Sequence, residues 1–406
     1  MRAVNRRLLT VLKATLKREK SVLLLGPRQT GKTTLVRLLG EDLYLNFMDA
    51  QLRQNYERTP GSLISEVKAI AARLNRKPLI ILDEIQKIPD VMDAIQVLID
   101  EGIAQFVITG SSARQLRNML PGRVIKYQLS PLSLAEFPTQ ELLLMLLNGS
   151  LPGIISIENQ NEIDDELRTY VSVYLEEEIR KEALVRNLGA FSRFLQLAAS
   201  QSGNLVSFRA LSQDVGIAHT TIAEYYRILE DCMIVERVDP ITKSQFRSRL
   251  TKSSKYLFFD LGIRRLAAQE GLSPSQETYG HLFEQWVGLE LNRFLRFKGS
   301  GKLRFWRDSS GPEVDWVIEI FGEYIPIEVK WTTSPTLKDC RHVITFLNEY
   351  KEAKRGFIVC RIPRPMQLAP GILAIPWEHL GEVFSETPSD TTHAKKEGDS
   401  HPTEDD

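Results

Sequence analysis

The chain has 406 residues, and at roughly 100–200 residues per domain this length predicts two to four folded units. Hydrophobic residues make up 43% and charged residues 26% of the chain, which is the composition of a folded protein and excludes a disordered or fibrous one. The 52 Lys and Arg residues balance the 52 Asp and Glu residues. A globally basic nucleic-acid binder is therefore excluded, although a local basic patch is not.

The cysteines and the apolar segments favour a cytoplasmic protein with no membrane partner. Cys232, Cys340 and Cys360 are far apart in the sequence, which disfavours a disulfide framework or a cysteine-built zinc site and fits a reducing compartment. The densest apolar run, 142–147, is much shorter than the roughly 18 residues of a membrane span. The amino-terminal segment lacks the long apolar core of a secretion signal, and its leucines predict an amphipathic helix.

The first 140 residues alternate strand-like and helix-like segments. Strands are predicted at 22–25, 44–47, 79–82, 106–109 and 124–129, and helices at 32–39 and 63–74. The segment 79–82 is entirely aliphatic, as expected for a strand in a parallel sheet whose two faces are both covered. This alternation predicts an α/β domain built on a parallel sheet over residues 1–140.

The rest of the chain is predicted to contain three folded segments and an acidic tail. Residues 141–190 form a helical linker, and residues 191–255 form a small helical module that ends in a strand. Residues 256–385 mix helices with strands at 303–306, 314–319, 324–329 and 356–359. The tail 386–406 is rich in acidic residues, Ser, Thr and Pro, and we expect it to be disordered.

A phosphate-binding loop is predicted directly after the first strand. Residues 26–33 read GPRQTGKT and match the GxxxxGK[ST] pattern between a strand and a helix. The glycines let backbone N–H groups face the phosphates of a nucleotide, Lys32 is expected to reach the β- and γ-phosphates, and Thr33 to bind Mg²⁺. The flanking elements disfavour an incidental glycine-rich turn. The predicted ATP-binding residues are Gly26, Pro27, Arg28, Gln29, Thr30, Gly31, Lys32, Thr33 and Thr34.

Two acids follow the aliphatic strand 79–82. Asp83 and Glu84 are expected at the carboxyl edge of the sheet, where open α/β sheets bind their ligands. Asp83 is predicted to hold magnesium through water, as in a Walker B motif, and Glu84 to polarise the attacking water. A lone aspartate at a strand end is usually a turn residue or a helix cap, but an acid pair after four aliphatic residues disfavours that explanation.

Further polar residues complete the predicted catalytic set. Thr109 and Ser111, at the end of the next strand, are candidates to orient the water and to respond to hydrolysis. Capping of a following helix by Ser111 or Ser112 is an equally good explanation and is compatible with the first. Arg123 is a candidate for the cation that neutralises transition-state charge, within one chain or toward a neighbouring copy in a ring or dimer. Many surface arginines have no such role.

The stretch from Arg7 to Phe137 resembles the amino-terminal domain of a prokaryotic AAA-like ATPase family. The matching motifs are LLLGPRQTGKTTL, IILDEIQKIPD, which includes Gln86, ITGSSARQL, LPGR and PLSLAEF. The resemblance implies an AAA-like P-loop domain that binds ATP and Mg²⁺, followed by an uncharacterised carboxyl-terminal region. The chain departs from the pattern at Glu178, where an aspartate is usual. A guanine-reading NKxD-like segment is not evident in the sequence, which favours ATP over GTP.

Residues 207–238 resemble a helix-turn-helix followed by the start of a wing. Apolar positions in both helices form the expected core, and Gly216 lies in the tight turn. The DNA-binding interpretation places a polar set near a groove or its phosphates: His219, Thr220, Thr221, Arg227, Lys243, Arg247, Arg249, Lys252 and Lys255. The alternative is a winged helix that serves as a rigid lid or spacer, and acidic residues in the second helix dilute its charge.

Four polar residues in 256–385 are candidates for a second site. Glu284 lies on a predicted helix, Asp315 on a strand, and Glu328 and Lys330 share one face of the next strand. Asp315 and Glu328 are candidates to coordinate Mg²⁺, and Lys330 to orient the attacking water or lower its pKa. This order resembles the PD-(D/E)xK nuclease fold, with Glu284 as its helical acid. An exposed Glu–Lys pair is nevertheless common on hairpins, so the pattern favours the fold more than it favours cleavage.

We therefore expect a Mg²⁺-dependent ATPase whose hydrolysis is coupled to a DNA-related task through winged-helix and PD-(D/E)xK nuclease-like domains. The alternative is a nucleotide-dependent switch or regulator whose carboxyl-terminal domains bind a protein partner or DNA without cleavage. Stimulation of ATP turnover by DNA favours the first, and unchanged turnover together with a captured protein partner favours the second. The oligomeric state remains open at the level of the sequence.

Overall fold

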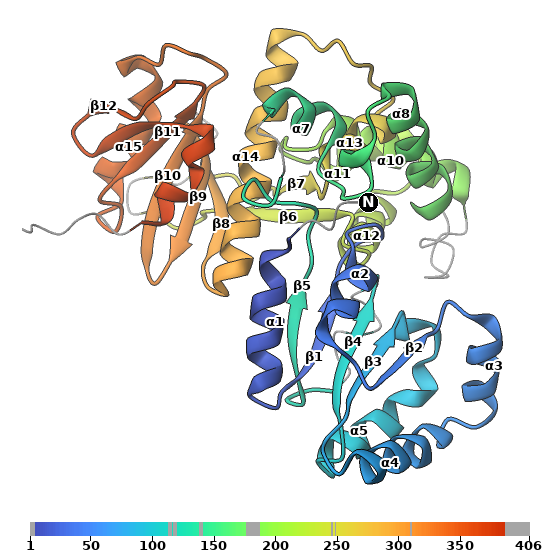
Figure 1. The fold of residues 1–406 in the computed structure, drawn as a ribbon. Coiled ribbons are helices and arrows are strands. Elements are labelled where there is room, and N and C mark those ends of the chain that lie inside the picture. Colours follow the sequence, from blue (N-terminus) through green and yellow to red (C-terminus); the bar gives the residue numbers. More distant parts are fainter. Residues whose placement is uncertain are drawn as a thin grey trace, which may run out of the picture.

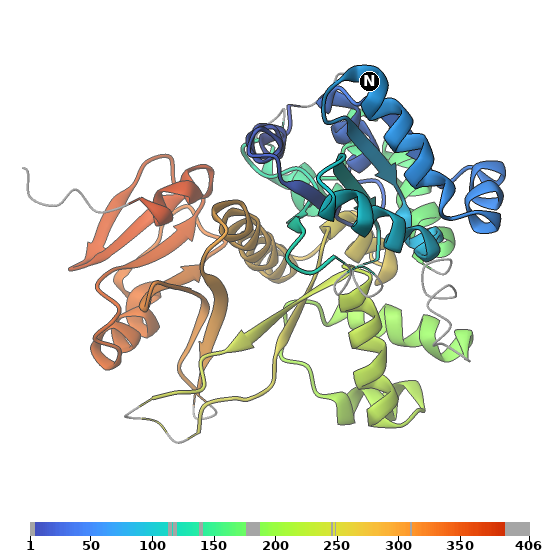
Figure 2. The same ribbon diagram turned by 90° about the horizontal axis from the view of Figure 1, so that it is seen from below.

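The computed structural model describes residues 5–112, 116, 120–137, 141–175, 187–244, 247, 249–308 and 311–385. These residues form a five-stranded sheet, a helical module and an eight-stranded sheet, and the first two strands of the larger sheet lie within the helical module in the sequence. In both views the long helix α14 (Gln276–Lys298) lies between the segment 313–385 and the amino-terminal sheet (Figures 1 and 2). No helix in the described part is long and apolar enough to cross a membrane, and the cytoplasmic location stays a prediction.

The first sheet is parallel throughout and has the strand order β2-β3-β4-β1-β5. Its strands are β1 (Ser21–Leu25), β2 (Leu43–Asn46), β3 (Leu79–Asp83), β4 (Gln105–Gly110) and β5 (Val124–Gln128). β1 and β4 lie inside the sheet, and nearly all of their residues are buried. The parallel α/β sheet predicted from the sequence is confirmed.

Helices cover both faces of this sheet, which explains why its strands are apolar on both sides. On one face α4 (Ser62–Leu74) and α5 (Met92–Asp100) pack against the strands, with Val67 and Ile95 in the core. On the other face α1 (Arg7–Lys17) and α2 (Lys32–Val36) pack through Leu12 and Leu35. Because all five strands are parallel, their carboxyl ends lie at the same edge of the sheet, and the P-loop begins at this edge.

Helices of the middle module share one hydrophobic core. They are α8 (Gln160–Thr169), α10 (Leu188–Ser200), α11 (Phe208–Val215), α12 (His219–Asp231) and α13 (Leu261–Ala267), and α7 (Leu142–Asn148) packs beside α13. Phe194 and Tyr226 lie fully buried in this core. Gly216, with φ +78°, forms the turn between α11 and α12, which suits a residue without a Cβ. α8, from the predicted linker, thus packs with the helices of the predicted module.

The second sheet has the order β12-β13-β11-β10-β9-β8-β6-β7. Its strands are β6 (Val235–Pro240), β7 (Lys255–Phe258), β8 (Lys302–Arg307), β9 (Glu313–Ile320), β10 (Glu323–Val329), β11 (Gly356–Cys360), β12 (Met366–Ala369) and β13 (Ile372–Pro376). α14 covers one face and α15 (Arg341–Glu349) the other. β6 pairs with both β7 and β8, so the strand expected to start a wing also continues the carboxyl-terminal sheet.

Some helices were not predicted, among them those at 50–58 and 92–100, and three expectations lie outside the described residues. α3 (Ala50–Arg58) is almost entirely polar and buries only Tyr56, so it has no apolar periodicity to reveal it. It begins at Asp49, whose carboxylate accepts the N–H groups of Gln51 and Leu52. Glu178, the tail 386–406 and the start of the helix that Ser111 or Ser112 was expected to cap are not part of the described structure.

Candidate functional site

The P-loop joins β1 to α2 and depends on two glycines. The N–H of Gly26 donates to the carbonyl of Gly110 at 3.3 Å, and a Cβ at Gly26 would lie 2.4 Å from the backbone oxygen of Leu129. Gly31 has φ +90°, a backbone conformation that strains any residue with a side chain. Both positions therefore require glycine for the loop to bend as a phosphate cradle.

Lys32 is folded back over the loop. Its Nζ donates to the carbonyls of Gly26 at 2.9 Å and Pro27 at 3.0 Å, and it lies 3.8 Å from Oε1 of Glu84. The lysine is 5% exposed. The oxygens of a bound triphosphate offer this ammonium stronger, charged acceptors than neutral carbonyls do, so we expect the side chain to turn toward a nucleotide when one binds.

The carboxylate of Asp83 gathers three hydroxyl groups at the end of β3. Thr33 Oγ1 donates to Oδ2 at 2.7 Å, Tyr44 donates to the same oxygen at 2.8 Å, and Thr109 Oγ1 donates to Oδ1. Burial and the negative charge of Asp83 raise the pKa of Tyr44, so its hydroxyl stays protonated. The structure thus brings together Thr33, Asp83 and Thr109 and adds Tyr44, a polar residue on a neighbouring strand that the motif analysis overlooked.

The second acid, Glu84, has partners of its own. Its backbone is left-handed, with φ +59°, and its N–H donates to Thr109 Oγ1 at 3.1 Å. Its Oε2 accepts from Ser111 Oγ at 3.2 Å and from the side-chain amide of Gln86, which also donates to Ser111 Oγ at 2.9 Å. A left-handed backbone is uncommon for a residue other than glycine. These contacts hold the carboxylate in place beside Lys32.

A cavity of about 690 Å³ lies over the P-loop. Residues 31–35, Asp83 and Glu84 line it on one side, and residues 152–154, Ile157 and Glu166 of the middle module line it on the other. Its volume lies within the range of about 300–1,000 Å³ that is typical of small-molecule sites. The lining combines polar P-loop groups with apolar surface suited to a base, from Leu38, Met48, Ile154 and Ile157. A nucleotide here would contact both modules, which the sequence did not indicate.

The groups at the phosphate end of this cavity fit a magnesium ion. Mg²⁺ takes oxygen ligands and commonly keeps several waters alongside phosphate oxygens. The Thr33 hydroxyl and the Asp83 carboxylate are in direct contact at 2.7 Å, and both residues line the cavity. These two residues would hold the ion, which would supply positive charge to the phosphates when bound.

Arg123 does not lie at this site. It directly precedes β5, whose first residue, Val124, pairs with Ser21 at the start of β1, whereas the P-loop follows the end of β1. Arg123 instead forms an ion pair with Asp100 at 2.7 Å. The topology therefore excludes a role for Arg123 at the nucleotide of its own chain, and a role toward a neighbouring copy stays a prediction. The sequence could have shown this, because Arg123 precedes the expected strand 124–129. In a parallel sheet the amino ends of the strands lie at the edge away from the P-loop.

Arg6 borders the cavity over the P-loop and was missed from the sequence. Its Nη1 donates to the carbonyl of Thr30 at 2.7 Å, its Nη2 to the carbonyl of Ser130 at 2.6 Å, and its Nε lies 3.3 Å from Glu136. Burial lowers the pKa of Arg6, and the neighbouring Glu136 opposes that effect. Arg6 thus connects the P-loop to the segment after β5, although it belongs to no recognisable motif.

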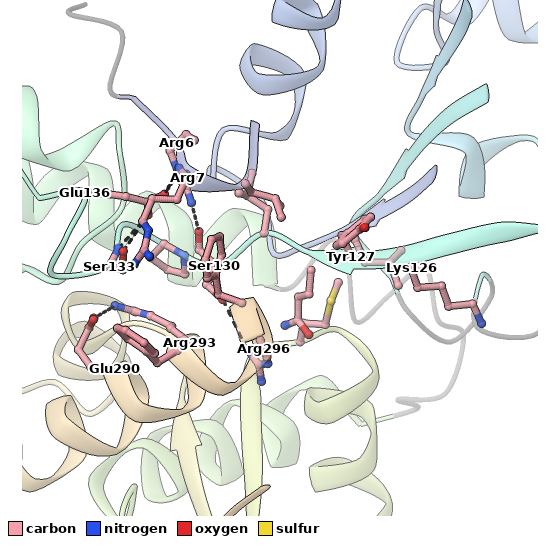
Figure 3. Close-up of a pocket in the computed structure, with 18 residues that line it drawn as sticks. Arg6, Arg7, Lys126, Tyr127, Ser130, Ser133, Glu136, Glu290, Arg293 and Arg296 are labelled. Carbon is pink, nitrogen blue, oxygen red and sulfur yellow. Dashed lines mark hydrogen bonds and ion pairs between the residues drawn. The ribbon is translucent and has the colours of Figure 1, made fainter. Parts of the chain in front are cut away.

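Arg6 also borders a second cavity, of about 400 Å³, between the first module and α14 (Figure 3). There Glu290 of α14 accepts the N–H of Leu134 at 2.9 Å and forms an ion pair with Arg293. Arg293 also donates to the carbonyl of Leu132 at 3.0 Å, and burial raises the pKa of Glu290. These contacts fasten α14 to the domain that carries the P-loop.

The residues of the predicted nuclease-like site lie close together. The antiparallel register that pairs Trp316 with Ile327 continues to Asp315 and Glu328, so these acids are neighbours across β9 and β10. Lys330 Nζ donates to Oε1 of Glu328 at 2.7 Å. The strand acid and the Glu–Lys pair therefore share one end of the hairpin.

A second lysine and the helical acid complete this cluster. Lys255 of β7 donates to Oε1 of Glu284 at 2.8 Å, its ammonium lies 4.8 Å from the ring centre of Trp316, and it is 8% exposed. Burial and the charges of Glu328 and Glu284 raise the pKa of Asp315. Across the described residues, no three acidic, histidine or cysteine side chains are grouped so that they could hold a metal ion. The predicted Mg²⁺ coordination by Asp315 and Glu328 involves two acids and stays a prediction.

Two of the basic residues predicted to contact DNA are paired with carboxylates in the structure. Arg247 pairs with Glu349 at 2.6 Å and Asp308 at 3.2 Å, and Lys255 is buried against Glu284. Both are held by carboxylates of this chain, so neither is available to phosphates. The other predicted residues are exposed, apart from the half-buried Thr221: His219, Thr220, Arg227, Lys243, Arg249 and Lys252.

Comparisons with known proteins agree with the nucleotide site. Residues 18–138 match the family model of an AAA domain. This stretch is therefore similar to the P-loop domains of AAA-type ATPases. Residues 139–276 and 279–380 match two domains of unknown function, DUF8612 and DUF4143. The family matches therefore support nucleotide binding at the amino end of the chain and leave the activity of the other two parts open.

Two relatives cover most of the chain. It is 27% identical over 334 residues to the uncharacterized protein Rv2008c of Mycobacterium tuberculosis, across 80% of this chain and 74% of the relative. It is 25% identical over 413 aligned positions to the uncharacterized protein MJ1637 of Methanocaldococcus jannaschii, across 89% and 84%. A solved Signal Transduction ATPase with Numerous Domains from Pyrococcus horikoshii aligns with 11% identity and a TM-score of 0.29, across 72% of this chain and 47% of that one. A TM-score this low carries no argument about function.

Proposed function

We propose that the protein binds ATP with Mg²⁺ between its P-loop domain and its middle module and hydrolyses it. The observation that carries the proposal is the direct contact of Thr33 and Thr109 with Asp83, beside Glu84, at the floor of a nucleotide-sized cavity. Phosphoryl transfer requires a P-loop for the phosphates, groups that hold Mg²⁺ and a group that orients the attacking water. The polar residues at the ends of these parallel strands are of these types. In this proposal Lys32 binds the β- and γ-phosphates.

Each residue of the floor then has a distinct task. Backbone N–H groups of the P-loop bind phosphate oxygens, and Thr33 and Asp83 hold the Mg²⁺, which supplies positive charge when bound. Glu84 accepts a proton from the attacking water, a role that requires a carboxylate held within hydrogen-bond reach of the water. Thr109 and Ser111 keep the two acids in place through the hydrogen bonds described above.

Phosphate release from Mg²⁺–ATP by the purified protein tests the proposal. We expect turnover with ATP that is abolished by EDTA and weaker with GTP. A protein that takes up no nucleotide in the presence of Mg²⁺ would contradict the proposal at its first step.

We further propose that the bound nucleotide acts as a switch on the middle module. The position of residues 152–154, Ile157 and Glu166 over the cavity supports this, because a nucleotide there contacts both modules. A DNA-related task rests instead on the winged-helix interpretation of α11, α12, β6 and β7 and on exposed cations such as Lys243 and Lys252. ATP turnover measured with and without duplex DNA, in a salt series, separates the two: unchanged turnover favours the switch, and salt-sensitive stimulation favours the DNA-related task.

Metal-dependent DNA cleavage is a second candidate activity for the carboxyl-terminal domain. The gathering of Glu284, Asp315, Glu328 and Lys330 favours it, whereas the buried Lys255 opposes it. Supercoiled-plasmid nicking by the wild type and by Asp315→Ala, with Mg²⁺ or Mn²⁺, tests this candidate. Loss of nicking in the variant would support cleavage, and equal background from both proteins would contradict it.

A further inference from the structure

The two oxygens of the Glu84 carboxylate have different surroundings. Oε2 accepts hydrogen bonds from Ser111 Oγ at 3.2 Å and from the side-chain amide of Gln86. Oε1 lies 3.8 Å from Lys32 Nζ, and both Glu84 and Lys32 line the cavity over the P-loop. One oxygen is therefore held by donors of the protein, and the other is left on the side of the P-loop lysine.

Gln86 connects the partners of this carboxylate. It belongs to η2 (Ile85–Lys87), a short 3₁₀ helix that closely follows β3. Its amide nitrogen donates to Glu84 Oε2 and, at 2.9 Å, to Ser111 Oγ, which is the full donor capacity of an amide. Ser111 directly follows Gly110, the last residue of β4, so the amide joins the ends of β3 and β4. Among the described residues, Gln86 and Ser111 lie outside the lining of the cavity, and we expect Gln86 to act on a nucleotide only through Glu84.

The surroundings of Gln86 favour one orientation of its amide. The reverse orientation would place the amide oxygen against the Glu84 carboxylate, where two acceptors would meet without a hydrogen between them. In the observed orientation Oε1 of Gln86 is buried and has no hydrogen-bond partner in the described part of the chain, which is unfavourable. This oxygen lies beside Gly110, where a Cβ would approach it to 2.8 Å. An apolar side chain would avoid the unpaired oxygen, so the two donors are what an amide contributes at this position.

We propose that Gln86 is a positioning residue for ATP hydrolysis, which holds Oε2 of Glu84 so that Oε1 faces the attacking water. The inference rests on the proposed function, because it concerns the base of that reaction. As the water oxygen bonds to the γ-phosphorus, the bond from this phosphorus to the β–γ bridging oxygen breaks, and ADP leaves with the electron pair. The proton of the water passes to Oε1 and then to solvent, which restores the carboxylate. A carboxylate already fixed through its other oxygen needs no reorientation in this step.

Two substitutions remove the donors of Gln86 and keep most of its volume. Gln86→Met replaces the amide by an apolar chain of similar length, and Gln86→Glu keeps the shape but places a second carboxylate beside Glu84. The loss of a hydrogen bond to a charged group that acts in the transition state slows a reaction by about 10- to 100-fold. We expect both variants to lower kcat by this factor. The Kd for ATP should stay unchanged, since Gln86 lies outside the lining of the cavity.

Gln105→Met is the matched control for the loss of a glutamine amide. The amide of Gln105 also makes two hydrogen bonds, to the carbonyls of Leu16 at 2.9 Å and Lys20 at 3.0 Å. Gln105 is the first residue of β4, at the end of the strand away from Ser111, so its substitution should leave kcat unchanged.

The double variant Glu84→Gln with Gln86→Met tests whether the effect passes through Glu84. Single-turnover hydrolysis of ATP by the full-length double variant should be no slower than that by Glu84→Gln alone, because the carboxylate that Gln86 positions is already gone. A glutamine that only supported the fold would add its own loss to that of Glu84→Gln.

Three results would overturn the inference. The first is a kcat for both Gln86 variants within about threefold of the wild type. The second is a loss in the double variant that adds fully to that of Glu84→Gln. The third is weakened or absent ATP binding in both Gln86 variants, which would assign Gln86 to the fold of the P-loop domain. A wild type without ATP turnover contradicts the proposed function, and the inference falls with it, whereas turnover by the wild type and undiminished turnover by the variants contradict the inference alone.

Discussion

Replacing Glu84 by Gln removes the proposed proton acceptor and keeps the shape of the side chain. The amide oxygen of Gln can still accept from Ser111 and Gln86, and the backbone N–H that donates to Thr109 is unchanged. The substitution also removes the negative charge that lies 3.8 Å from Lys32 Nζ. In the variant the side chain at position 84 no longer attracts the Lys32 ammonium as a carboxylate does. Lys32 is then freer to contact the phosphates, so ATP binding should be unchanged or tighter.

The expected loss of turnover follows from the position of this carboxylate. A general base held in place contributes about 10²–10⁴-fold to a rate, which corresponds to about 3–5 kcal/mol of activation free energy. Asp83 cannot replace it easily, because its two oxygens already accept from three hydroxyl groups. We therefore expect kcat of Glu84→Gln to fall at least about a hundredfold, without an increase in the Kd for ATP.

Phosphate release measures kcat, and titration with a fluorescent ATP analogue measures Kd. The matched control is Glu101→Gln, an exposed acid of the same domain that pairs with Lys68 on the surface, and it should leave both values unchanged. A kcat for Glu84→Gln within about tenfold of the wild type would refute the assignment of Glu84 as the base. Loss of ATP binding would show instead that Glu84 supports the fold of the site.

Three further substitutions test other parts of the structure. Gly26→Ala should destabilise the chain by about 1–3 kcal/mol in urea unfolding and weaken nucleotide binding. The added Cβ would lie 2.4 Å from the Leu129 carbonyl oxygen and force the loop to shift. Wild-type stability of this variant would contradict the prediction. Arg6→Ala should cost about 1–3 kcal/mol and raise the Kd for ATP, since it deprives the carbonyl of Thr30 of its buried donor, and an unchanged Kd would count against a role in shaping the P-loop. Asp315→Asn should raise the melting temperature at pH 7–8. Burial and neighbouring acids raise the pKa of Asp315 in the folded chain, so the folded state binds this proton more tightly and the wild type loses stability as the pH rises above the ordinary carboxyl pKa. The gain should disappear below about pH 4, where both states hold the proton, and an equal gain at every pH would rule out this cause.

The sequence alone was sufficient to predict the parallel sheet and to place the candidate nucleotide-binding residues at the ends of its strands. GPRQTGKT follows one aliphatic strand and the acids Asp83 and Glu84 follow another, and parallel strands end at one edge of a sheet. The direct contact of Thr33 with Asp83, which are far apart in the chain, is a consequence of this rule. Local patterns are enough here because strand direction and order bring the segments together.

Tertiary structure decided the features that depend on side chains from distant segments. Arg6 reaches the P-loop, residues 152–154 and Ile157 line the cavity above it, and Lys255 pairs with Glu284 of the next domain. None of these residues belongs to a recognisable motif. The partner of each is set by how distant segments pack and pair, and those segments have no distinctive local sequence pattern. The same reasoning explains Lys255, which in sequence is one cation of a basic run and in the folded chain is a buried counter-ion. Burial converts such a residue from a surface charge into part of a site, and only the folded chain shows which residues are buried together.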